Sequence, residues 1–158
     1  NVRPFTWSAF SREEAAAIRA FLDRRKGRAV PFWLPTWQQD LRLASDVAID
    51  QTIVSVRWVR YAQQMFPNSG SRRYLAIYSV DRAATYHKIV DANDPGNGLT
   101  ESLTISPAAP RLWPAETTIV SFLRLCRLEE DEVELAWDST EFAQTVLRLR
   151  DLPQEAAL

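Results

Sequence analysis

A single helical segment, followed only by strand-type patterns, most constrains what this chain can fold into. Ser11 and Glu14 form a capping box, in which the serine hydroxyl accepts from the Glu14 amide and the Glu14 carboxylate reaches back. Apolar residues then recur every three or four positions as far as Leu22, and Gly27 provides a left-handed stop. We therefore predict one amphipathic helix over residues 12–26.

The remainder of the chain shows the period-two alternation of β-strands. Val54, Val56 and Trp58 alternate with polar residues. Further strand patterns cover residues 74–80, 86–90, 102–106, 117–128, 133–137 and 144–151, with turn clusters at 67–71 and 91–98. We expect 117–128 and 133–137 to form a hairpin across an acidic turn at 129–131. One helix with about seven such strands predicts an α+β, mostly β fold, an antiparallel β-sandwich or barrel with one N-terminal amphipathic helix.

Length and composition fit one domain. The 158 residues are 46% hydrophobic, enough for one sizeable core and too few for two independent ones. Pro153 ends the last strand pattern. We predict a single β-rich domain over residues 1–153 and a loose C-terminal tail over 154–158.

Charge and hydropathy argue against several partners. Lys and Arg number 19 against 20 for Asp and Glu, a formal net charge of -1, so no global basic field exists to hold a nucleic acid. No apolar run approaches the roughly 20 residues of a membrane-spanning helix, and we expect no signal peptide. The lone Cys126 rules out an intramolecular disulfide framework. Stability is expected to come from packing.

No motif in the sequence predicts catalysis, a cofactor or a metal. We interpret His87 as a partly exposed strand histidine and Cys126 as a small buried apolar residue. The loop at 91–98 resembles a calcium loop only superficially, since Pro95 takes the fifth position and Ser102 the twelfth. The acidic run at 129–132 is expected to be solvated. We predict that the protein is not an enzyme and needs no cofactor.

Aromatic residues supply the candidate binding surface. Residues 29–37 contain two prolines that favour extended backbone, and the four-residue gap places Trp33 and Trp37 on the same side of such a segment. They fit a core, a protein interface or a platform for sugar rings. The candidate interface residues are Phe32, Trp33, Trp37, Trp113, Arg24 and Arg25.

The chain resembles the minor tail proteins of tailed bacteriophages. The resemblance rests on the amphipathic helix, Gly27, the aromatic segment 31–37 and Asp40-Leu41. In the second half it rests on residues 122–128, the acidic turn, 133–137 and the closing 147–153. The pattern is similar to the distal tail and lambda minor tail protein M group, whose members form rings between the tail tube and the baseplate hub or tip.

The resemblance implies a structural role in the virion. It implies a homo-oligomeric ring, hexameric by family analogy, that contacts the tail tube protein and the baseplate hub proteins, with no nucleic acid and no membrane insertion. The protein would be made in the host cytoplasm and reside in the phage tail. The alternative hypothesis is a carbohydrate-binding module that uses Trp33, Trp37 and Trp113. A hydrolase using His87 or Cys126 is a third possibility.

Overall fold

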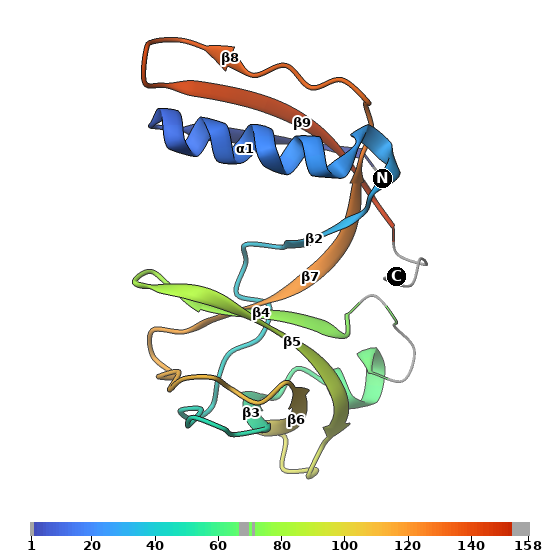
Figure 1. Cartoon of the computed structure of the whole chain (residues 1–158). Coiled ribbons are helices and arrows are strands. Elements are labelled where there is room, and N and C mark those ends of the chain that lie inside the picture. Colours follow the sequence, from blue (N-terminus) through green and yellow to red (C-terminus); the bar gives the residue numbers. More distant parts are fainter. Residues whose placement is uncertain (1, 67–69, 71, 153–158) are drawn as a thin grey trace. The chain divides into compact units, whose positions relative to one another are not determined.

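The structure is a computed structural model that describes residues 2–66, 70 and 72–152 (Figure 1). The chain forms two compact units. The first contains Asn1–Trp33 and Leu125–Leu158, and the second contains Leu34–Arg124. Strands β2 (Phe32–Pro35) and β7 (Ile119–Leu128) each begin in one unit and end in the other.

The first unit is built on a small antiparallel sheet. Strand β1 (Val2–Ala9) pairs along its whole length with β9 (Ala143–Asp151), from Val2 opposite Arg150 to Ala9 opposite Ala143. The other side of β9 pairs with the last residues of β7 at one end and with the short strand β8 (Ala136–Trp137) at the other. In β9 the leucines are buried and the intervening arginines are exposed, as the alternation predicted.

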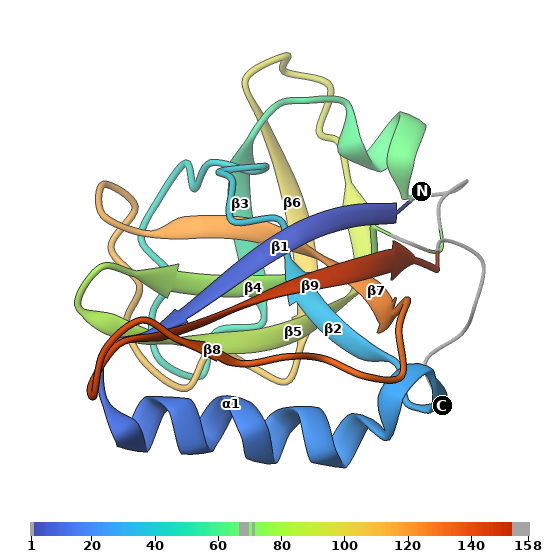
Figure 2. The same cartoon turned by 90° about the horizontal axis from the view of Figure 1, so that it is seen from above.

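Helix α1 (Arg12–Arg25) belongs to the same unit, and Figure 2 shows it running beside β8 and β9. The predicted cap is confirmed: the Glu14 amide donates to Ser11 Oγ (3.1 Å), and Phe10 N–H donates to the Glu14 carboxylate (2.7 Å). The helix ends one residue before the predicted limit, because Lys26 itself adopts the left-handed conformation. A 3₁₀ turn, η1 (Gly27–Ala29), follows.

A small core holds the helix to the sheet of the first unit. Ala15 and Ile18 on α1 pack with Ala9 of β1 and Ala143 of β9, and all four are buried. Half-buried Trp7, Leu22 and Leu135 surround them. The alanines allow a close approach of helix and strands, and Trp7 covers one side of the contact.

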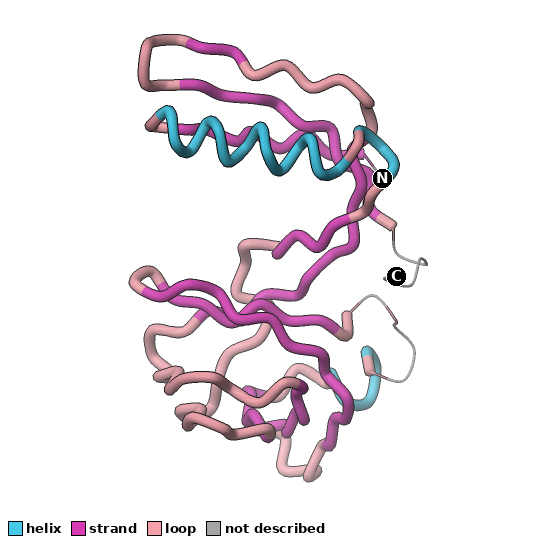
Figure 3. Tube along the Cα trace, in the orientation of Figure 1, coloured by secondary structure: helices cyan, strands magenta, loops and turns pink. Residues whose placement is uncertain are grey.

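The second unit holds the larger core. Its antiparallel sheet runs from the first half of β7 through β4 (Tyr74–Ser79), β5 (Arg82–Asn93) and β6 (Thr100–Ser106) to β3 (Ile53–Arg57). A five-residue π-helical turn, η2 (Tyr61–Met65), precedes β4. The largest buried side chains include Trp113 and Tyr61. Figure 3 shows that strands are the main regular element of the part of the chain that the structure describes.

The predicted fold class, α+β and mostly β with one N-terminal helix, is confirmed. The predicted hairpin of 117–128 with 133–137 is wrong. Strand β7 pairs with β4 and β9, and only Ala136–Trp137 of the second segment is a strand, paired with β9. The loop at 91–98 begins later than predicted, since β5 continues to Asn93. The single domain over 1–153 stays a prediction, and the tail at 154–158 lies outside the described residues.

Candidate interaction surfaces

A tightly bonded turn in the second unit carries Trp37. Thr36 N–H donates to the Phe122 carbonyl (3.0 Å), and the Asp40 N–H donates to the Val120 carbonyl (3.0 Å). The Asp40 carboxylate accepts from the Phe122 amide (2.8 Å) and from the Thr36 hydroxyl. These bonds attach both ends of the turn to β7, so the residues between them have little freedom to rearrange.

Trp37 is displayed to solvent by this turn. Its side chain is 57% exposed, and its φ of 59° is in the left-handed region, which bulky residues rarely adopt. The indole ring lies edge-to-face against Tyr78, with centroids 5.7 Å apart. The Tyr78 hydroxyl is in turn 3.0 Å from Ser121 Oγ. The turn therefore holds an aromatic side chain, in a costly backbone conformation, where a partner can reach it.

Two predicted interface residues prove to be buried. Trp113 is completely inaccessible, and its backbone pairs with Val47 through two hydrogen bonds of 2.8 and 2.9 Å. Phe32 is 8% exposed and packs edge-to-face on Phe21 at 5.2 Å. Both residues complete a core, so the prediction that they contact a partner is corrected.

The other predicted interface residues are divided between structural and exposed roles. Arg25 is half-buried: its guanidinium lies over the Phe21 ring at 4.8 Å and donates to the Pro31 carbonyl at 3.3 Å. Arg24 is exposed on α1 and donates to the Ala20 carbonyl (3.2 Å). Trp33 is half-buried in β2, which ends at Pro35. The extended alternation that was to align Trp33 with Trp37 therefore stops before Trp37.

Strand β1 was missed by sequence reasoning and forms an open edge of the first unit's sheet. Its eight residues pair with β9 on one side, and no strand pairs with the other side within residues 2–66, 70 and 72–152. Val2, Pro4 and Thr6 are exposed, whereas Phe5 and Trp7 are partly covered. This alternation was the available sequence signal, but Pro4 interrupts it and lowers the strand propensity.

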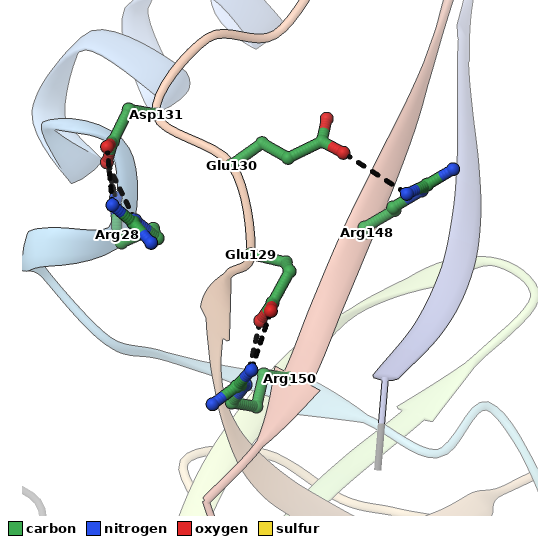
Figure 4. A network of polar contacts seen from close by, with 6 residues as sticks. All are labelled: Arg28, Glu129, Glu130, Asp131, Arg148 and Arg150. Atoms are coloured by element: carbon green, nitrogen blue, oxygen red, sulfur yellow. Dashed lines mark hydrogen bonds and ion pairs between the residues drawn. The ribbon is translucent and has the colours of Figure 1, made fainter.

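The acidic run at 129–131 is paired with arginines of the first unit (Figure 4). Glu129 accepts two hydrogen bonds from Arg150, at 2.6 and 2.7 Å. Glu130 lies 3.4 Å from Arg148, and Asp131 lies 3.0 Å from the Arg28 guanidinium. The bonds from Arg150 lower the pKa of Glu129. The pKa of Asp131 is lowered by the bond from the Arg28 backbone N–H and then by its guanidinium.

These ion pairs fix an otherwise irregular segment. The acids were predicted to be solvated at a hairpin tip, and they are indeed at the surface, but each of the three has a basic partner from η1 or β9. Exposed pairs contribute little stability one by one, so their main effect is on the path of the chain between β7 and β8.

His87 was predicted to be partly exposed, and the structure corrects this. The side chain is 3% exposed, its Nδ1 donates to the Pro107 carbonyl (2.8 Å), and its Nε2 lies 2.8 Å from Thr85 Oγ1. Burial lowers the pKa of His87 by penalising the charged form. Both ring nitrogens are occupied by internal contacts, as expected of a structural histidine. Cys126 is buried, as predicted, with its sulfur 3.5 Å from Asp151 Oδ1.

Glu101 is a fully buried carboxylate that no sequence motif indicated. Its Oε1 accepts from the backbone amides of Val59 (2.7 Å) and Tyr61 (3.1 Å), and its Oε2 accepts from that of Ala62 (2.7 Å). Three amide donors compensate for the lost hydration of the charge. Glu101 therefore anchors the start of η2 to β6.

Asp94, an acid of the loop that resembles a calcium site, is used in internal hydrogen bonds. The Asp94 carboxylate accepts from the Trp58 indole (3.0 Å), the Gln63 side chain (2.7 Å) and the Gly96 amide (2.8 Å). Among the described residues, no group of three or more His, Cys, Asp or Glu side chains is placed to hold a metal ion. No helix in that part of the chain is long and apolar enough to cross a membrane.

No protein-family model matches the chain. No curated protein matches it either. The resemblance to phage tail proteins therefore stays a prediction, and the surfaces described above carry the functional argument.

Proposed function

We propose that this protein is a structural component of a bacteriophage tail tip or baseplate, a ring-forming distal or minor tail protein that connects the tail tube to the hub. The observation that carries the proposal is the open edge of β1. An eight-residue strand, with one side that no strand of the described residues pairs with, presents backbone donors and acceptors that a second chain can complete. A subunit of a closed ring needs such a surface on every copy.

Pro4 indicates which β1 residues face that open side. Proline lacks an N–H and is tolerated in an edge strand where that position points away from the neighbouring strand. Alternate residues share a direction, so Thr6 and Ser8 would also direct their backbone groups outward. Pro4 removes one donor, and pairing with another chain would then use the Thr6 to Ser8 half of the strand.

Trp37 supplies a second contact suited to assembly. Interfaces concentrate their binding energy in a few residues, and tryptophan is prominent among them. An exposed indole held by the Thr36–Asp40 turn loses little conformational freedom on binding.

The titratable groups whose pKa values are shifted, such as His87 and Glu129, take part in internal contacts that suit a structural role.

The alternative proposal is a carbohydrate-binding module, and Trp37 is also the observation that favours it. With Trp113 in the core and Trp33 half-buried in β2, the exposed part of the three-tryptophan platform is the Trp37 face beside Tyr78. Replacing Trp37 with Ala distinguishes the two functions. Loss of glycan binding in a folded protein that still assembles favours the module, whereas loss of assembly favours the tail component.

The β1 edge can be tested by the pair Thr6→Pro and Thr6→Val. Proline removes the outward N–H, whereas valine retains it and suits a strand. We expect light scattering on size-exclusion chromatography to show an oligomer for the wild type and Thr6→Val, and smaller species for Thr6→Pro. Circular dichroism checks that each variant is folded. An unchanged oligomer in folded Thr6→Pro would contradict the role of this edge.

A further inference from the structure

A groove of about 510 Å³ lies along α1 in the first compact unit. Its volume is within the usual range of ligand sites in proteins. One wall is helical and the other is formed by the segment from Leu135 to Thr140. The lining residues are Arg12, Ala15, Ala16, Arg19, Leu135, Trp137, Ser139 and Thr140.

The helical wall is a stripe of small side chains with a cation at each end. Arg12, Ala16 and Arg19 are spaced by four and three residues and share one face of α1. The alanines leave the space of the groove open. Seven residues of helix place the two arginine positions about 10 Å apart.

The two arginines differ in their partners. Arg12 donates through Nε to the Thr140 carbonyl at 3.2 Å, which ties the helix to the opposite wall and leaves the other guanidinium nitrogens for a ligand. The Arg19 side chain is exposed and makes no hydrogen bond or ion pair with any residue of the described ranges. Both charged residues that line the groove are cationic, so the groove favours an anionic ligand.

The opposite wall supplies an aromatic ring and an open strand edge. Trp137 is 46% exposed, and Leu135 is half-buried. Strand β8 pairs with β9 on one edge, and the other edge has no backbone partner within the described part of the chain. Because the Asp138 N–H donates to the Phe142 carbonyl, the register directs the backbone groups of Trp137, and not those of Ala136, to that edge, where they can pair with an incoming strand.

We propose that this groove binds an extended acidic peptide segment of a neighbouring protein. The peptide adds as a strand to β8, places an apolar side chain on Trp137 and Ala16, and directs acidic residues to Arg12 and Arg19. Since side chains alternate along an extended chain, the apolar residue and the two acids occupy every second position, and acids four positions apart are separated by about 13 Å, which the long arginine side chains can reach. This inference rests on the proposed function, because an assembled tail protein would supply the peptide.

The lining favours a peptide over an anionic sugar. A sugar site needs several converging polar side chains, and the hydroxyls of Ser139 and Thr140 are the only uncharged polar side chains in the lining. A peptide instead uses the main-chain groups of β8 for affinity and the apolar floor for one side chain, which is the usual division in strand addition.

The test is an array of random nine-residue peptides probed with the full chain and three variants. Arg19→Gln removes one cation, and Ala16→Leu fills the groove without changing its charge. Arg24→Gln is the matched control, because Arg24 is exposed on the same helix but does not line the groove. We expect the bound peptides to carry two acidic residues around an apolar one. We expect about tenfold weaker binding for each groove variant, because Arg19→Gln removes one charge-assisted bond and Ala16→Leu fills the space of the apolar side chain.

Each outcome decides the proposal. Acidic peptides whose binding is weakened by Arg19→Gln and Ala16→Leu, and not by Arg24→Gln, support it. No bound peptides, peptides without acidic residues, or binding unaffected by both groove variants would overturn it, as would retention of anionic glycans alone on a parallel glycan array. If the protein forms a ring but binds no peptide on the array, this inference fails and the proposed function stands. If the protein binds acidic peptides but remains a monomer, the ring-forming function fails and this inference stands.

Discussion

Replacing Gly27 with alanine is expected to destabilise the first compact unit through two separate effects. Gly27 has a φ of +62°, where a side chain costs about 1–2 kcal/mol. A Cβ at this position would also lie 2.5 Å from Asp131 Oδ1 and 2.7 Å from Asp131 Cα. Overpacking of this kind costs about 1–3 kcal/mol. The sum is a loss of about 2–5 kcal/mol in the free energy of unfolding.

Two further variants separate these effects. Gly96 has a φ of +77° and nothing within 4 Å of a Cβ, so Gly96→Ala carries the backbone cost alone, about 1–2 kcal/mol. Asp131→Ala removes the carboxylate oxygen but leaves the main chain of residue 131 in the way of the new methyl group. Gly27→Ala should therefore remain destabilising in the Asp131→Ala background, because backbone cannot move away as easily as a side chain.

Urea unfolding followed by circular dichroism and tryptophan fluorescence measures these differences. Thermal unfolding provides a second readout, with a loss of about 4–20 °C in Tm for Gly27→Ala. If Gly27→Ala is no more destabilising than Gly96→Ala, the close approach of Asp131 is not a real constraint. If the loss caused by Gly27→Ala in the Asp131→Ala background falls to that of Gly96→Ala, only the Asp131 side chain was in the way.

Two more predictions concern buried ionisable groups. Glu101→Gln should lower the free energy of unfolding by about 1–3 kcal/mol in urea titrations, because an NH₂ group would face an amide donor where a carboxylate oxygen now accepts. An unchanged urea midpoint would argue against the role of Glu101 in anchoring η2 to β6. Burial lowers the pKa of His87, so the unfolded chain binds the extra proton first and the contribution of His87 to stability is complete above about pH 6.5. The contribution of His87 to the free energy of unfolding should decline as the pH falls toward the lower pKa of the folded state. The plot of unfolding free energy against pH should therefore be flatter for His87→Gln than for the wild type between about pH 7.5 and 5. Identical slopes for the two proteins would refute this assignment.

Local signals in the sequence predicted local structure well. The Ser11 and Glu14 cap defines the start of α1, because the bonds that form it lie within four residues. The burial of Leu147 and Leu149 followed from strict alternation in β9. Such features depend on nearby residues alone, and this is why pattern and propensity suffice for them.

Pairings between distant segments were not predictable in the same way. The segment 133–137 alternates well enough to suggest a hairpin with 117–128, but the ladder partner of β7 at its end is β9. Any strand of suitable pattern can pair with any other, so the choice is made by the whole fold and not by the nearest neighbour along the chain. The same reasoning explains the oversight of β1, whose partner β9 is at the opposite end of the sequence.

For the candidate surfaces too, the sequence indicated the residue types but not where the fold places them. Aromatic content identified the relevant residue types, but tryptophans serve cores and interfaces equally well. Trp113 is in the core and Trp37 is exposed because of long-range packing and of the turn bonded to β7. The groove beside α1 combines residues 12–19 with 135–140, a juxtaposition that neither segment indicates by itself.

Native mass spectrometry of the full chain, with negative-stain imaging of the species it detects, tests the central claim most directly. A ring-forming tail protein predicts one discrete closed oligomer, hexameric by the family analogy, with a ring visible in the images. A folded protein that remains monomeric at high concentration, and that is absent from assembled tails, would contradict the account and would bring the carbohydrate-binding alternative to the front.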